Sequence, residues 1–193
     1  MPPKARITRD MILDAAFDLV RAEGHEALNV RTLAKHLGCS TQPILYNFAA
    51  VEELKDAVYQ RADEFHTAYI LPKGGEGADA LLELGLNYVR FGHEEKHLFR
   101  FLFESDRFGG MDFKGLLRWP GSDELVAILA EALGCPAAEA EKLFMTFFAV
   151  AHGLASLLCN NAMEYDGTEC AAMLETVFNG ALAALTSKGE EYA

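Results

Sequence analysis

The sequence predicts an all-α protein, with a small N-terminal three-helix head and a larger helical body. Apolar residues recur every three to four positions along most of the chain, which is the spacing of one face of a helix. Glycine and proline interrupt this pattern where helices are expected to end. The sequence shows no convincing pair of alternating strands, no internal repeat and no low-complexity tract.

The expected helices begin and end at residues suited to those positions. Gly24 ends the first helix, and Glu52-Glu53 suit the positive end of the dipole of a later, long one. Gly92 is expected to break the body between two helices, and the glycines of residues 104–121 predict irregular structure. Helices are predicted over residues 8–23, 51–70, 78–91, 94–103, 123–133, 137–160 and 166–185, besides two short ones after Gly24.

Those two short helices carry the pattern that says most about function. One apolar stripe on the first of them is formed by Val30, Leu33, Ala34 and Leu37. Gly38 then ends this helix, and Ser40 offers a side-chain oxygen to cap the second one. In the second helix, Ile44 and Phe48 lie four residues apart on the buried side. Two short helices joined by a glycine-containing turn form a helix-turn-helix, whose second helix lies in the major groove of DNA.

The region around this motif resembles the N-terminal domain of the TetR family of transcriptional regulators. The similar residues are 12–17 and Gly24 in the first helix, Thr32-Leu33-Ala34 and Leu37-Gly38 in the second, and Phe48 with Glu52-Glu53-Leu54 at the junction into the fourth. The resemblance implies a helix-turn-helix head followed by a helical body that binds an effector and forms a dimer.

Two positions depart from the family pattern. Leu45 stands where the family usually has a tyrosine, with Tyr46 one place later, and Val51 stands where it usually has a lysine. Both family residues commonly contact phosphate, so those two contacts are not carried over to this chain. A helical adaptor whose head no longer contacts DNA is therefore one alternative function.

The second short helix is predicted to read bases. Ser40 is expected to cap it, so that Pro43 falls in the first turn, where its missing N–H costs little. Gln42 can make a bidentate contact to adenine, and Leu45 or the methyl group of Thr41 can meet a thymine methyl. Tyr46 and Arg31 suit phosphate contacts. The predicted DNA-binding residues are Lys4, Arg6, Arg31, Ser40, Thr41, Gln42, Leu45 and Tyr46, the first two on a flexible arm.

The distribution of charge allows DNA binding despite a formal net charge of −12. Residues 1–48 hold six basic and five acidic side chains, a net charge of +1, whereas residues 49–193 hold 11 basic and 24 acidic ones, a net charge of −13. Salt screens charges over about 10 Å, so a locally basic head can bind DNA although the body is acidic.

Cysteine spacing and hydropathy predict a soluble, cytoplasmic protein without a membrane partner. The cysteines, at positions 39, 135, 159 and 170, have neither the spacing of a metal site nor that of a CxxC pair, which suits thiols in a reducing compartment. The first residues lack the apolar segment of a signal peptide. The most apolar stretch, residues 147–159, is too short to span a bilayer.

A literal H-E-x-x-H motif, from His93 to His97, supports a second alternative. On one helix this spacing places two imidazoles one turn apart to bind zinc, with Glu94 as the general base of a hydrolase. The charged pair Glu95-Lys96, the preceding Gly92 and the lack of any further ligand motif favour a solvated helix start instead.

Aromatic residues predict a ligand pocket in the body. Nine of the 13 phenylalanines lie between Phe91 and Phe148, in a region interrupted by glycines. Aromatic walls with irregular backbone suit a concave, largely apolar site, and the family resemblance implies an effector pocket in the same part of the chain. Core packing is the alternative for each residue. The predicted ligand-binding residues are Phe99, Phe103, Trp119, Phe147 and His152, and the expected effector is a partly apolar small molecule.

Small residues on the last two helices suit either a homodimer or packing within one chain, and the family resemblance favours the homodimer. They permit close approach between helices, and paired helices of this length suit a four-helix interface between two copies. The predicted interface residues are Ala151, Ala155 and Ala181.

These observations predict a sequence-specific transcriptional regulator, with residues 1–48 as the DNA-binding domain and residues 49–193 as the effector-binding and dimerisation domain. Its partner is a double-stranded DNA operator, from which a small-molecule effector releases it as a repressor. An effector is expected to displace the helix over residues 51–70 and so change the separation of two heads that read half-sites about 34–36 Å apart. No catalytic residue, metal or cofactor is predicted.

Overall fold

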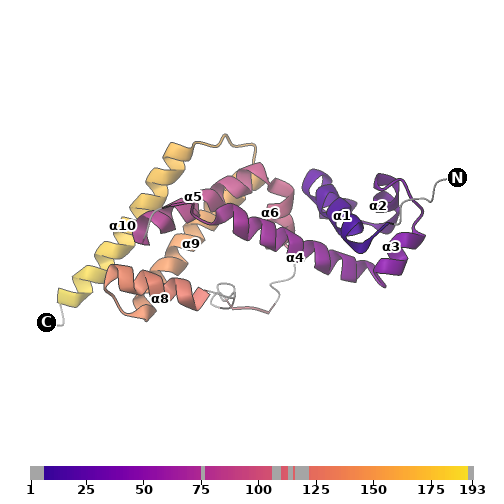
Figure 1. Ribbon diagram of the computed structural model, residues 1–193. Helices are drawn as coiled ribbons and strands as arrows, with labels where there is room; N and C mark the ends of the chain where they lie inside the picture. The colour runs from indigo at the N-terminus through magenta and orange to yellow at the C-terminus, as the bar shows by residue number, and fades with distance from the viewer. Residues whose placement is uncertain (1–6, 75–76, 106–109, 113–114, 116–121, 191–193) are drawn as a thin grey trace. The chain divides into compact units, whose positions relative to one another are not determined.

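The computed structural model describes residues 7–74, 77–105, 110–112, 115 and 122–190 (Figure 1). Regular structure in these residues is helical throughout, which confirms the all-α prediction. The chain divides into two compact units, each of which is assembled from two separate segments of the sequence.

The first unit comprises Met1–Ala68 together with Glu95–Ser105. Its helices are α1 (Arg9–Glu23), η1 (His25–Ala27), α2 (Val30–His36), α3 (Gln42–Asn47), most of α4 (Val51–Ile70) and α6 (Lys96–Phe103). The core is built from the apolar faces of all the longer helices, because each contributes side chains with almost no exposed surface. These include Ile12, Leu33, Ile44, Phe48, Leu54, Val58, Leu98 and Phe99.

The second unit comprises Tyr69–Glu94 and Asp106–Ala193. Its helices are α5 (Gly77–Glu94), α8 (Ser122–Leu133), α9 (Ala137–Asn160) and α10 (Gly167–Glu190). Glycine lets α5 lie very close to α9. A Cβ atom added at Gly85 would lie 2.5 Å from the ring of Phe147, and one added at Gly92 would lie 2.8 Å from the Cβ of Ala155.

Two of the predicted helices have the observed limits, α4 over residues 51–70 and α9 over residues 137–160. The predicted break at Gly92 is wrong. Gly92 lies inside α5, and the chain leaves the helical conformation at Glu95, whose φ and ψ angles are −113° and 49°. Gly92 is present because α9 leaves no room for a side chain, so it does not end the helix.

One described helix, α9, is long and apolar enough to cross a membrane by length and composition alone. Core helices of soluble proteins meet the same two criteria. Eight side chains of α9 are buried within the second unit, among them Leu143, Phe144, Phe147 and Leu158. This burial accounts for the apolar composition of α9.

Candidate nucleic-acid interface

Hydrogen bonds cap both ends of α2, and those at its end form the turn that leads to α3. The side chain of Asn29 caps the helix, because its Oδ1 accepts hydrogen bonds from the amides of Arg31 (3.1 Å) and Thr32 (3.0 Å). At the other end, Gly38 adopts the left-handed conformation, with φ of 63°. The amide of Gly38 bonds to the carbonyl of Lys35, and that of Cys39 bonds to the carbonyl of Ala34. This is a Schellman motif, and glycine supplies its backbone conformation.

The start of α3 differs from the prediction that Ser40 caps it. The helix begins at Gln42, and Thr41 precedes it in a helical conformation without a side-chain cap. Ser40 is therefore not the cap. Pro43 in the first turn has no N–H group and so removes one of the amides that a capping oxygen would satisfy.

Helix α3 has one buried face and one exposed face. The side chains of Ile44 and Phe48 are each 1% exposed, as predicted, whereas Leu45 is 53% and Tyr46 is 83% exposed. Gln42 is exposed beside them on the same helix. A large apolar and a large aromatic side chain thus lie in solvent, available to a partner.

The other predicted DNA-binding residues lie on α2, on the turn before α3, or on the N-terminal arm. Arg31 and Ser40 are exposed, and Thr41 is half-buried. Lys4 and Arg6 lie outside the described residues. The structure therefore places Ser40, Thr41, Gln42, Leu45 and Tyr46 on one continuous segment, with Arg31 in the first turn of α2.

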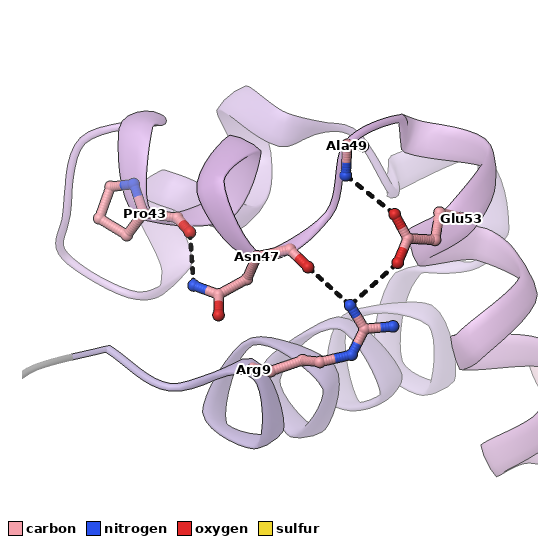
Figure 2. A network of polar contacts seen from close by, with 5 residues as sticks. All are labelled: Arg9, Pro43, Asn47, Ala49 and Glu53. Carbon is pink, nitrogen blue, oxygen red and sulfur yellow. Dashed lines mark hydrogen bonds and ion pairs between the residues drawn. The ribbon is translucent and has the colours of Figure 1, made fainter.

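Figure 2 shows a network around the end of α3 that sequence reasoning missed. The guanidinium group of Arg9, at the start of α1, donates hydrogen bonds to the carbonyl of Asn47 (2.6 Å) and to a carboxylate oxygen of Glu53 (3.0 Å). The other oxygen of Glu53 accepts from the amide of Ala49 (2.9 Å). These two bonds hold the pKa of Glu53 below its usual value, with the Ala49 amide as the larger cause. One feature of the sequence points to this network. Glu53 is the third residue of a predicted helix, and an acidic side chain at that position can accept a hydrogen bond from an amide just before the helix.

A second arginine joins α1 to the segment that precedes α6. Arg21 forms a two-bonded ion pair with Glu95, and its guanidinium group also lies 4.8 Å from the centre of the Phe65 ring. The hydrogen bonds to Glu95 raise the pKa of Arg21. Glu95 thus holds α1 within the first unit.

The alternative of a zinc hydrolase finds no support in the structure. His93 lies on α5 and His97 lies on α6, and Glu95 interrupts the helix between them, so the two imidazoles are not one turn apart on a single helix. The ring of His93 stacks on Tyr165, and the Nδ1 atom of His97 lies next to Gly24. Among the described residues, no group of three or more His, Cys, Asp or Glu side chains is arranged to hold a metal ion.

The residues predicted to bind an effector are divided between the two units. Phe99 and Phe103 lie on α6 in the first unit, where Phe99 is fully buried and Phe103 packs edge-on against His66. Phe147 and His152 lie on α9 in the second. Phe147 is a core residue against Gly85 and Phe178. Trp119 lies outside the described residues.

His152 is half-buried and belongs to a polar pair inside the second unit. Its Nδ1 atom lies 2.9 Å from the hydroxyl oxygen of Tyr88, and its ring stacks on Phe148. Burial raises the pKa of Tyr88, so this hydroxyl stays protonated. The pair therefore offers a hydrogen-bonding group within aromatic surroundings.

The three predicted dimer residues have different environments. Ala151 and Ala155 are buried inside the second unit, and Ala155 packs against Gly92. Their assignment to a dimer interface is corrected, because their side chains are already covered by their own chain. Ala181 on α10 is half-buried. Neighbouring parts of α9 and α10 form a shallow, mainly apolar groove lined by Val150, Glu169, Ala172, Met173, Thr176 and Val177.

Comparison with known structures gives the fold a family context. A TetR-like transcriptional regulator from Rhodococcus sp. RHA1 is similar over 95% of this chain and 98% of its own, with 18% identity and a TM-score of 0.65. A TetR-family regulator from Streptomyces coelicolor is similar over 100% of this chain and 85% of its own, with 19% identity and a TM-score of 0.65. These likenesses show the fold.

Sequence comparison shows the family. Two curated relatives, the class D tetracycline repressor protein of Escherichia coli and the class H protein of Photobacterium damsela subsp. piscicida, are each 31% identical over 78 residues. These matches cover 40% of this chain and 36% of each relative, so the chain spans about a third of their length. The family model described as the tetracyclin repressor-like C-terminal domain matches residues 81–183, which is more than half of the chain. The chain therefore belongs to the TetR family of transcriptional regulators.

Proposed function

We propose that this protein binds a double-stranded DNA operator in a sequence-specific manner, with α3 in the major groove. The observation that carries the proposal is the division of α3 into a buried face, with Ile44 and Phe48, and a solvent-exposed face, with Leu45 and Tyr46. A helix so short, following a glycine turn and α2, has the form of the second helix of a helix-turn-helix.

The exposed groups suit different contacts with DNA. Gln42 would form a bidentate pair with adenine, and Leu45 would meet a thymine methyl group. Tyr46 and Arg31 would bind phosphate, Thr41 would supply a methyl or hydroxyl contact, and Ser40 would bind near the turn. Lys4 and Arg6 would add contacts from the N-terminal arm.

The regulatory output that we propose is repression relieved by a small molecule. The two curated relatives are named tetracycline repressors, which supports this choice for the present chain. Under this proposal residues 1–48 bind DNA, residues 49–193 bind the effector and form a homodimer, and the protein acts in the cytoplasm, where its operator lies. The groove between α9 and α10 supports the dimer, since it leaves apolar side chains open to solvent.

A partly apolar effector fits the second unit best. The Tyr88–His152 pair supplies a hydrogen-bond donor and acceptor, and Phe148 lies beside both rings. Ligand sites of this kind combine aromatic walls with few polar groups. Of the predicted ligand-binding residues in the second unit, His152 is the one that would contact the effector.

The test is a binding titration with DNA from upstream of the protein's own gene, at several salt concentrations. Leu45→Ala should weaken binding to the preferred fragment. Leu71→Ala is the matched control, because Leu71 is 54% exposed but lies outside the helix-turn-helix. Equal binding of the wild type to upstream and unrelated DNA would contradict the proposal.

A further inference from the structure

Arg9 is the hub of the network that surrounds the end of α3 (Figure 2). One guanidinium group bonds to the last carbonyl of α3, bonds to Glu53 on α4, and lies 3.9 Å from the centre of the Phe48 ring. Glu53 in turn accepts the Ala49 amide. The contacts therefore cover the whole connection from Asn47 to the first turn of α4.

The recognition helix depends on such outside contacts for its orientation. It contains six residues and has no side-chain cap at its start. Isolated helices of this length do not form in water, so the surrounding structure must hold it. At its end, the side-chain amide of Asn47 donates to the carbonyl of Pro43 (2.8 Å), and the backbone carbonyl of Asn47 accepts from Arg9.

The position of Arg9 suits α3 better than it suits its own helix. Arg9 is the first residue of α1, where a cation meets the positive end of the helix dipole. The same guanidinium group lies at the negative end of α3, where a cation is favourable. The charge is thus placed to stabilise the end of the recognition helix.

We propose that Arg9 and Glu53 form a clamp that sets the orientation of α3 for specific DNA binding, so that both are positioning residues. The inference rests on the proposed DNA-binding function. It concerns residues outside the predicted DNA contacts, since Arg9 and Glu53 act through the backbone of residues 47–49.

The clamp and simple electrostatics predict opposite effects on DNA binding when the charge of Glu53 is removed. A carboxylate on a DNA-binding head repels phosphate, so simple electrostatics predicts that removing its charge strengthens DNA binding. The clamp predicts the opposite, because loss of the ion pair frees the end of α3. The two explanations therefore differ in the direction of the effect.

The experiment compares Glu53→Gln with Glu52→Gln in the full-length protein. Both changes remove one negative charge from the first turn of α4. Each variant is titrated with the preferred operator and with unrelated DNA, and its thermal unfolding is recorded. Glu53→Gln should weaken operator binding by up to about fivefold per half-site, the upper end of the range of a single exposed ion pair. Its binding to unrelated DNA should be unchanged or tighter. Glu52→Gln should bind both DNAs as tightly as the wild type, or more tightly.

Arg9→Lys supplies the second variant. It keeps the positive charge, so a direct phosphate contact or general attraction to DNA would survive. It removes the planar guanidinium group, which lies 3.9 Å from the centre of the Phe48 ring and whose Nη1 atom donates to both Asn47 and Glu53. The clamp predicts weaker operator binding with an unchanged salt slope.

The outcomes separate the clamp from the proposed function. If the wild type prefers its operator but Glu53→Gln binds it like Glu52→Gln, the clamp is wrong and the DNA-binding function stands. A loss of both specific and unrelated binding, with a lower unfolding temperature, means a general folding defect and also contradicts the clamp. A wild type without operator preference overturns the function and the clamp together.

Discussion

The two units of this protein both have apolar cores but differ in the contacts that they add to the core. Among the described residues of the first unit, three ion pairs join separate helices or segments: Arg9 with Glu53, Arg21 with Glu95, and Arg61 with Asp14. In the second unit, α5 approaches α9 and α10 through glycines that leave no space, with Gly85 against Phe147 and Gly92 against Ala155.

This difference indicates which changes each unit tolerates. Exposed ion pairs contribute little individually and weaken with salt, so the loss of one such pair in the first unit should cost little free energy. Close-packed interiors respond strongly to a single added methyl group. An added methyl group in the second unit should therefore cost more than the loss of one ion pair in the first.

The largest expected effect on stability comes from His66, a buried histidine of the first unit. It should exceed the effect of losing any one ion pair of that unit. Burial lowers the pKa of His66 from 6.5 to about 4. Below pH 6.5 the unfolded state takes up a proton that the folded state refuses, so stability falls with falling pH until about pH 4. The loss is roughly 3 kcal/mol in total, at about 1.4 kcal/mol per pH unit.

Denaturant unfolding at several pH values between 7 and 4 checks this prediction. In His66→Gln, which cannot take up a proton in this range, the corresponding part of the pH dependence should disappear. If the wild type and His66→Gln lose stability equally as the pH falls, burial of His66 is not the cause.

A change on the exposed face of α3 should affect binding and leave stability almost unchanged. Gln42→Ala should cost about 1–3 kcal/mol on the preferred operator and relax base choice at one position per half-site. Arg31→Ala should instead weaken all sequences alike and flatten the salt slope by about one unit. Titrations over a randomised half-site measure both, and an unchanged base preference in Gln42→Ala means that Gln42 reads no base.

In the second unit, Gly92→Ala should destabilise the protein. The new Cβ atom would lie 2.8 Å from the Cβ and 2.9 Å from the carbonyl oxygen of Ala155, and the latter belongs to the backbone of α9. Overpacking costs about 1–3 kcal/mol, from which the better helix propensity of alanine recovers up to about 1 kcal/mol. Denaturant unfolding should show the net loss.

Gly153→Ala is the matched control, since it also lies inside a helix. A Cβ atom there would meet nothing within 4 Å. Stability should therefore rise, by up to about 1 kcal/mol. A loss of stability in Gly153→Ala would contradict this prediction.

The smallest effect is expected for Asp14→Asn. The side chains of Asp14 and Arg61 are roughly half exposed, although their charged atoms lie 2.7 Å apart. Exposed pairs of this kind contribute about 0.2–1 kcal/mol, and less at high salt. Unfolding in low and high salt should show a small difference from the wild type that shrinks as salt rises. A loss of more than about 2 kcal/mol would show that the surface pairs are structural supports.

Local patterns predicted the helices well because each depends on nearby residues. The limits of α4 and α9, the glycine turn after α2 and the inward orientation of Ile44 and Phe48 all follow from helical periodicity and end residues. Gly92 was misread because the same residue type serves close packing and helix ends, and only the position of Ala155 distinguishes them.

Contacts between distant residues could not be predicted in this way. Arg9 and Glu53 are 44 positions apart, and Arg21 and Glu95 are 74 apart. Nothing in the periodicity of either partner identifies the other. The same limit applies to the predicted pocket, because Phe99 and Phe147 both fit an aromatic stripe but belong to different units.

The membership of α6 in the first unit has a consequence for synthesis on the ribosome. Most of that unit is made by residue 68, but α6 follows only after the whole of α5, together with Glu95 just before it. This segment supplies the partners of Arg21, Gly24 and His25. At about 5–20 residues per second, the unit waits several seconds for its last helix. During that interval the surfaces of α1 and η1 that α6 contacts in the finished unit lack this partner.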